Sequence, residues 1–88
     1  MWLVPCPVES NGLVRALRTE CGHVVLMCDE CATVWLTPDT VEVAPGLQQD
    51  APEWLVAPGV AITPGTTRWA TFDELPKEWQ SYPWYSNV

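Results

Sequence analysis

Residues 23–31 read HVVLMCDEC, an apolar run that ends in two cysteines separated by two residues. Its β-branched and apolar residues predict a strand. The spacing of Cys28 and Cys31 is typical of a turn whose two thiolates hold one soft metal ion. Residues 20–22 (ECG) have turn character, and residues 13–18 before them are a second strand candidate. The stretch therefore predicts a β-hairpin that carries half of a metal site at its end.

The other half of the site lies upstream and has one cysteine fewer. Cys6 is followed three positions later by Glu9, which occupies the place that Cys31 has after Cys28. A four-ligand site with this spacing would therefore use Cys6, Glu9, Cys28 and Cys31. A carboxylate oxygen can bind zinc at about 2.0–2.2 Å. We therefore predict a structural Zn²⁺ held by these four residues. Three alternatives stay open: a degenerate site that keeps its fold without metal, pairing of the cysteines as disulfides, and a different metal.

Cys21 and His23 have the chemistry of metal ligands but lie at the far end of the predicted hairpin. Seven extended residues at about 3.3 Å each would separate Cys21 from Cys28 by roughly 23 Å, which one metal ion cannot span. Both residues are therefore expected to lie outside the site, unless the chain doubles back before Cys28.

The dipeptide Cys6-Pro7 and residues 28–35 (CDECATVW) resemble the two ends of a zinc ribbon. The resemblance covers about residues 3–37 and implies two metal-binding turns joined by a hairpin. The fold class that follows is small and β-rich, with a zinc-ribbon-like hairpin, a short antiparallel sheet and one short C-terminal helix. The length of 88 residues indicates a single domain, residues 1–88.

Within that domain, residues 1–40 form the ribbon-like part and residues 41–88 a loop-rich part. Residues 33–37, 54–56, 60–62 and 67–70 are short strand candidates between turns rich in proline and glycine. Thr71 and Glu74 have the spacing of a capping box, which predicts a helix near residues 71–80 that Pro76 could shorten. An aromatic tail follows it.

The chain is acidic, with eleven Asp and Glu against four Lys and Arg and a net charge of −7. This charge disfavours nonspecific nucleic-acid binding and anionic membrane surfaces, and favours a basic partner. No signal peptide is visible and no apolar run is long enough for a membrane span, so a cytoplasmic location is expected. No phosphate-binding loop or nucleophile motif is present, so we do not expect an enzyme.

Six tryptophans form a large excess in a chain of this length. Trp35 and Trp69 lie in strand candidates and are expected to fill the core. In the tail, core packing and partner binding are equally good interpretations, since interface hot spots favour Trp and Tyr. The partner-binding candidates are Trp79, Tyr82, Trp84 and Tyr85, with the acidic Asp73 and Glu74 beside them.

The start at Cys6-Pro7, residues 28–35 and residues 69–75 together resemble small bacterial zinc-ribbon-type immunity proteins of polymorphic toxin systems. The resemblance implies a protein-binding inhibitor of a basic partner such as a toxin nuclease. The alternative is a nucleic-acid-associated zinc ribbon of transcription or translation, for which Arg15 and Arg18 would supply a small basic spot. Rubredoxin-like electron transfer is a third class, but it needs four thiolates and the hairpin offers three.

Overall fold

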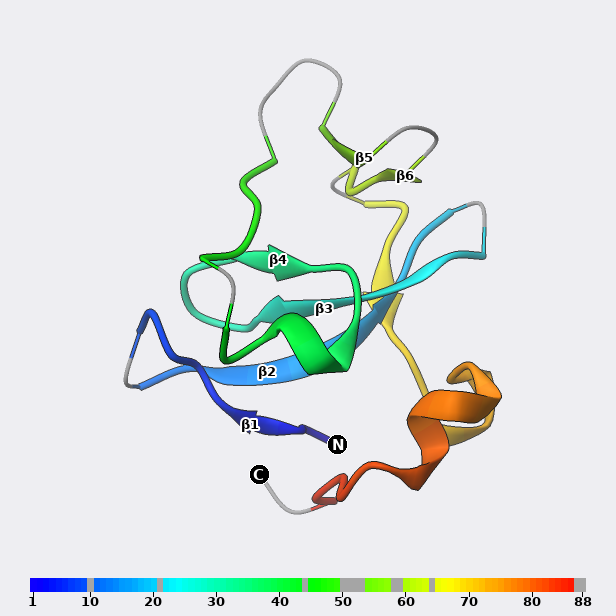
Figure 1. The fold of residues 1–88 in the computed structure, drawn as a ribbon. Helices are drawn as coiled ribbons and strands as arrows, with labels where there is room; N and C mark the ends of the chain where they lie inside the picture. Colours follow the sequence, from blue (N-terminus) through cyan, green and yellow to red (C-terminus); the bar gives the residue numbers. More distant parts are fainter. Residues whose placement is uncertain are drawn as a thin grey trace.

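The chain is built around one hairpin, seen here in a computed structural model that describes residues 1–9, 11–20, 22–43, 45–49, 54–57, 60–63 and 65–86 (Figure 1). Strand β2 (Leu13–Arg18) pairs antiparallel with β3 (Val24–Cys28), and Val14 lies opposite Cys28. Val14 and Ala16 are fully buried, whereas Arg15 between them is only half-buried, as the two-residue period of a strand requires. The predicted hairpin is confirmed.

Three short strands extend the hairpin into a five-stranded antiparallel sheet. β4 (Val34–Trp35) pairs with β3 and lies within the strand predicted at residues 33–37. β2 pairs with two strands in succession, β1 (Val4–Pro5) beside its first residues and β7 (Arg68–Trp69) beside its last. β7 was expected from the sequence. β1 was not, because its proline is tolerated only at a sheet edge.

The sheet buries side chains on both faces. Leu17, Val25, Val34 and Ile62 form the smaller core cluster, and Ala16 and Leu26 belong to the larger one on the opposite face. The larger cluster consists of Leu3, Cys6, Val14, Ala16, Leu26, Cys28, Trp35, Val41, Ala70, Leu75 and Trp79. Two of the candidate metal ligands are thus part of the main core.

The middle of the chain adds a separate two-stranded sheet of β5 (Leu55–Ala57) and β6 (Val60–Ala61). Its Val56 and Val60 pack against the smaller core cluster. The strand candidates at residues 54–56 and 60–62 therefore correspond to real, though very short, strands.

The predicted C-terminal helix is not confirmed. Residues 71–81 contain two 3₁₀ turns, η2 (Phe72–Glu74) and η3 (Lys77–Ser81), and the part of the chain that the structure describes has no α-helix. The expected start is present, since the Thr71 backbone N–H donates to Glu74 Oε1 at 3.0 Å. The helix stops because Pro76 follows: the residue before a proline is driven out of the helical region, and Leu75 has ψ 144°.

The tryptophans divide between the core and the surface. Trp35 is 2% exposed, which confirms its core role, whereas Trp69 is 42% exposed, so the core role expected for it is wrong. Trp69 lies on β7, where Arg15 covers its ring with the guanidinium carbon 5.8 Å from the centroid. Its indole therefore packs under a cation at the sheet surface.

The C-terminal tail folds back onto the start of the chain. Trp2 and Tyr85 exchange two backbone hydrogen bonds of 2.8 Å each, and their rings stack with centroids 4.5 Å apart. The start of the chain and the red segment before residue 87 accordingly lie near each other in Figure 1. Trp84 is fixed by its indole N–H, which donates to the Trp79 carbonyl oxygen at 2.7 Å.

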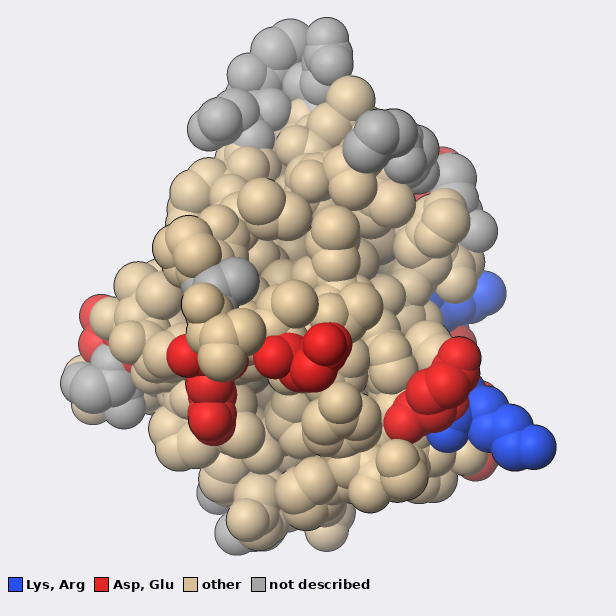
Figure 2. All heavy atoms as spheres, in the orientation of Figure 1, with Lys and Arg blue, Asp and Glu red and all other residues tan. Residues whose placement is uncertain are grey.

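Ion pairs take up most of the positive charge. Arg15 pairs with Asp29 at 2.9 Å, and both Arg18 and Arg68 pair with Glu74. Figure 2 shows carboxylates spread over the face seen in Figure 1, with Lys and Arg atoms only toward one margin. The carboxylates on this face therefore outweigh the cationic side chains, in agreement with the acidic composition.

Candidate metal centre

Three cysteine sulfurs meet at one end of the sheet. Cys6 follows β1, Cys28 ends β3, and Cys31 lies in the turn between β3 and β4; their Sγ atoms are all within 4.8 Å of one another. The Sγ atoms of Cys6 and Cys31 are 3.7 Å apart. Zinc–sulfur bonds of about 2.3 Å in a tetrahedron would put the sulfurs about 3.8 Å apart. The cluster could hold a metal ion, as the spacing of these three cysteines predicts.

Backbone amides hold two of the sulfurs in place. The N–H groups of Val8 and Glu9 donate to Cys6 Sγ at 3.3 and 3.2 Å. The second turn repeats the pattern, since two amides, from the residues two and three positions after Cys28, donate to its Sγ at 3.4 Å each. Donors that point at a sulfur stabilise its thiolate form, which is the form that binds metals.

The third sulfur is held by side chains. Cys31 Sγ lies 3.2 Å from Thr33 Oγ1, which also accepts a hydrogen bond of 3.1 Å from Gln48 Nε2. Because the amide nitrogen can only donate, the Thr33 hydroxyl keeps its own proton for Cys31. Burial opposes ionisation of Cys31, but hydrogen bonds from Thr33, Cys28 and Cys6 together outweigh it and lower the pKa of the thiol.

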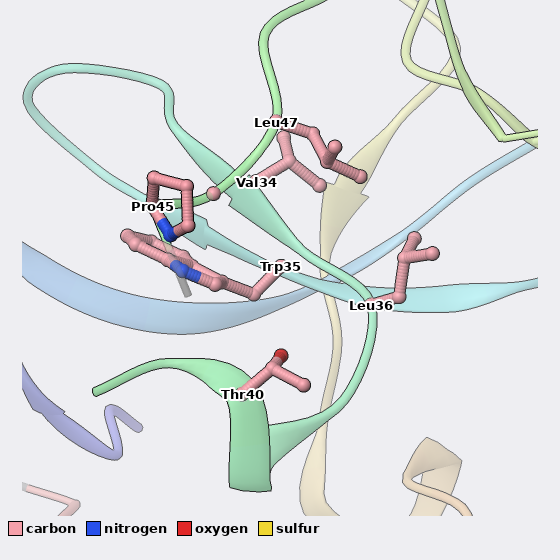
Figure 3. A pocket seen from close by; sticks show the side chains of 7 residues that line it. Val34, Trp35, Leu36, Thr40, Pro45 and Leu47 are labelled. Atoms are coloured by element: carbon pink, nitrogen blue, oxygen red, sulfur yellow. The ribbon is translucent and has the colours of Figure 1, made fainter. Parts of the chain in front are cut away.

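The loop that carries Gln48 is fixed against β4. Leu47 exchanges two backbone hydrogen bonds with Val34, and Figure 3 shows Pro45 lying over the Trp35 indole. Gly46 has φ 84°, and a Cβ there would overlap Thr33 Cγ2. The close approach permitted by this glycine brings Gln48 within reach of the Thr33 hydroxyl.

Burial and mutual repulsion both oppose ionisation of the three thiols. Burial raises the pKa of the Cys28 thiol to about 11. Three thiolates this close would also repel one another, so a cation among them would remove both penalties. The donor set of soft sulfurs and the directed N–H groups both suit a bound metal ion.

Gly12 leaves room for the cluster. It is buried, and a Cβ added to it would overlap Cys28 Sγ. Its backbone also joins the first turn, since its N–H donates to the Glu9 carbonyl and its own carbonyl accepts from the Cys6 N–H. Sequence reasoning missed Gly12, Thr33 and Gln48, because nothing in their spacing shows which loops pack together.

The other proposed ligands have different positions. Glu9 contributes its backbone N–H to Cys6, while its Oε1 accepts from the Asn11 N–H at 3.3 Å. Its carboxylate is not among the described groups that cluster with the three cysteines, so Glu9 as a fourth ligand stays a prediction. His23 is exposed at the opposite end of the hairpin from Cys28, and Cys21 lies outside the described residues.

The predicted partner-binding residues all lie in the C-terminal segment, with unequal exposure. Trp79 is 9% exposed and belongs to the core, Tyr82 and Trp84 are half-buried, and Tyr85 is 48% exposed. The carboxyl groups also differ. Glu74 is engaged by two arginines, and hydrogen bonding from Arg68 lowers its pKa to about 2, whereas Asp73 is exposed.

No helix among the described residues is long and apolar enough to cross a membrane. Comparison with known proteins finds no matching family model, no matching curated protein and no matching solved structure.

Proposed function

We propose that this chain is a small cytoplasmic protein-binding domain, stapled by a structural Zn²⁺, that inhibits a basic partner such as a toxin nuclease in the manner of an immunity protein. The observation that carries the proposal is an open hollow of about 440 Å³, most of whose lining is aromatic. It is lined by Met1, Phe72, Tyr82, Pro83, Trp84, Tyr85 and Ser86. Aromatic side chains at the surface are the commonest anchors of protein interfaces.

The hollow has exposed aromatic rings that contacts with neighbouring residues hold in place. Phe72 and Tyr85 are 44% and 48% exposed, so their rings can contact a partner directly. Tyr85 stacks on Trp2, and Trp84 is tied to the core through the carbonyl of Trp79. A partner would thus meet side chains that lose little conformational freedom on binding, which favours affinity.

The charge of the chain supports a basic protein partner. The net charge is −7, and three of the four cationic side chains are paired within the chain, Arg15, Arg18 and Arg68. Arg15 and Arg18 are the two residues that a nucleic-acid-binding ribbon would use. Their pairing with carboxylates disfavours that alternative, because phosphate contacts need available cations.

The Zn²⁺ part of the proposal rests on the donor chemistry. Soft thiolates select zinc, Cu(I) and iron–sulfur clusters, and of these zinc is the usual ion of structural sites with three cysteines and one further ligand. The buried Cys6 and Cys28 favour a structural ion over a catalytic one, which keeps a position open for water or substrate. Glu9 or a solvent molecule would complete the coordination.

Metal content of the untagged protein tests the zinc. We expect about one Zn²⁺ per chain by elemental analysis, a loss of metal in Cys28→Ser, and a lower Tm after chelation. The exposed Thr66→Val is the matched control and should keep its metal. A zinc content far below one per chain, with an unchanged Tm in chelator, would refute the structural ion.

Inhibition tests the partner. The chain, immobilised and exposed to host extract at physiological salt, should retain a basic nuclease whose cleavage of labelled DNA or RNA falls to background at a 1:1 ratio. Phe72→Ser should weaken the inhibition about fivefold or more, since surface anchors contribute about 1–2 kcal/mol or more. Leu55→Ser, similarly exposed at 46% but outside the hollow, should not. Failure to inhibit any retained nuclease would refute the function.

A further inference from the structure

A second surface feature lies next to the aromatic hollow. It is a groove of about 270 Å³ that shares Tyr82 and Pro83 with that hollow. The groove is lined by Leu3, Val4, Pro38, Asp39, Val41, Glu42, Val43, Tyr82 and Pro83. Leu3 and Val41 are 4% and 1% exposed and form its floor, whereas Val43 is 82% exposed.

Two carboxylates stand on the rim of this groove. Asp39 lies in the 3₁₀ turn η1 (Pro38–Thr40), and Glu42 follows two residues after its end; both are exposed. Both also belong to the lining of the same groove. In Figure 2 carboxylates gather over η1 and the chain that follows it. The two acids therefore face solvent together beside an apolar floor.

These carboxylates differ from the paired ones described above. Asp29 and Glu74 are neutralised by arginines, whereas within the described part of the chain no cation forms an ion pair with Asp39 or Glu42. An apolar groove with two uncompensated negative charges is complementary to a cationic segment that also carries an apolar side chain. The negative charge of the groove disfavours nucleic acid and anionic lipid, which are also negatively charged.

We infer that this groove binds a basic segment of a protein partner, with an apolar side chain over Val41 and an arginine or lysine between Asp39 and Glu42. The inference rests on the proposed function and names where the basic partner docks. Together with the aromatic hollow, the groove makes one continuous surface through Tyr82 and Pro83. The hollow would supply the aromatic anchors and the groove the charge selectivity.

A peptide titration followed by NMR tests the groove directly. The full ¹⁵N-labelled chain is titrated with the peptide Gly-Arg-Leu-Arg-Gly and, separately, with Gly-Glu-Leu-Glu-Gly. The basic peptide should shift the backbone amides of residues 39–43 and of Tyr82, and the acidic peptide should not. Equal shifts with both peptides, or shifts confined to other parts of the chain, would overturn the inference.

Charge variants distinguish the effect of the two carboxylates on the groove's rim from the effect of the chain's net charge. Asp39→Asn/Glu42→Gln should weaken binding of the basic peptide about three- to tenfold, as for two exposed ion pairs. Glu20→Gln/Glu78→Gln makes the same change in net charge at two other exposed positions and should leave the affinity within twofold. An equal loss in both variants would show that only net charge matters and would overturn the assigned site.

The same variants distinguish this inference from the proposed function. If a retained nuclease is inhibited equally well by the wild type and by Asp39→Asn/Glu42→Gln, the groove is refuted and the function stands. If the basic peptide binds at the groove but no nuclease is inhibited, the inhibitor function is refuted.

Discussion

Removal of the Thr33 hydroxyl should weaken metal binding by about ten- to a hundredfold. Thr33 is 1% exposed, so water cannot replace the hydrogen bond that its hydroxyl gives to Cys31. A hydrogen bond to a charged group contributes about 1.5–3 kcal/mol, and each 1.4 kcal/mol is tenfold in affinity. Gln48 is exposed and can turn its amide to water, so losing its contact adds little. Ligand-supporting hydrogen bonds in metalloproteins have effects of similar size.

The assay is competition for Zn²⁺ between the protein and a chromophoric chelator, with the Co²⁺–thiolate absorption as a spectroscopic readout. Thr33→Val should lower the affinity and alter the Co²⁺ spectrum. Thr33→Ser, which keeps the hydroxyl, should restore both, and Thr66→Val at the surface should change neither. An affinity within twofold of wild type for Thr33→Val would refute this reasoning. An equal loss in Thr33→Ser would instead assign Thr33 a packing role.

Three further outcomes are expected. Gly12→Ala should destabilise the protein by about 1–3 kcal/mol and weaken metal binding, because its Cβ overlaps Cys28 Sγ; an unchanged Tm and zinc affinity would contradict the crowding. Glu74 has a pKa lowered from its usual 4.5 to about 2 by Arg68, so its stabilisation should be complete above about pH 5 and fade as the pH falls toward 2. In urea unfolding at a series of pH values, the stability of Glu74→Gln should fall less than that of the wild type between about pH 5 and pH 2. Equal losses in the two proteins would contradict the role given to Glu74. Trp84→Phe should cost about 1 kcal/mol in the same assay, because the Trp79 carbonyl oxygen loses its indole N–H donor; no loss would mean that water replaces the bond.

The parts of the fold that the sequence predicted depend on local patterns. The run at residues 23–31 encodes both a strand and a cysteine turn, so β3 and the positions of Cys28 and Cys31 follow from neighbouring residues alone. A hairpin brings the start of its first strand next to the end of its second. Because Cys6 precedes β2 and Cys28 ends β3, the position of Cys6 near that turn could also be predicted.

The remaining features depend on contacts between distant segments. β1 is two residues long and exists because β2 offers it a partner. Gln48 supports Cys31 only because the loop before it packs on β4, which no spacing rule reveals. The helix near residues 71–80 is not confirmed: its start signal at Thr71 is present, and the effect of Pro76 on Leu75, a shortening that the sequence allowed for, ends the first turn.

The joining of the chain ends through Trp2 and Tyr85 has a consequence for the order of folding. Each doubling of the loop that a contact closes costs only about 0.6 kcal/mol of entropy, but that cost must be met before the contact forms. The hairpin and cysteine turns close short loops, so they should assemble first, and the terminal contact should form last and open first in native-state hydrogen exchange. Opening of this contact would release Tyr85 from one side of the aromatic hollow while the cysteine cluster and the hairpin stay closed.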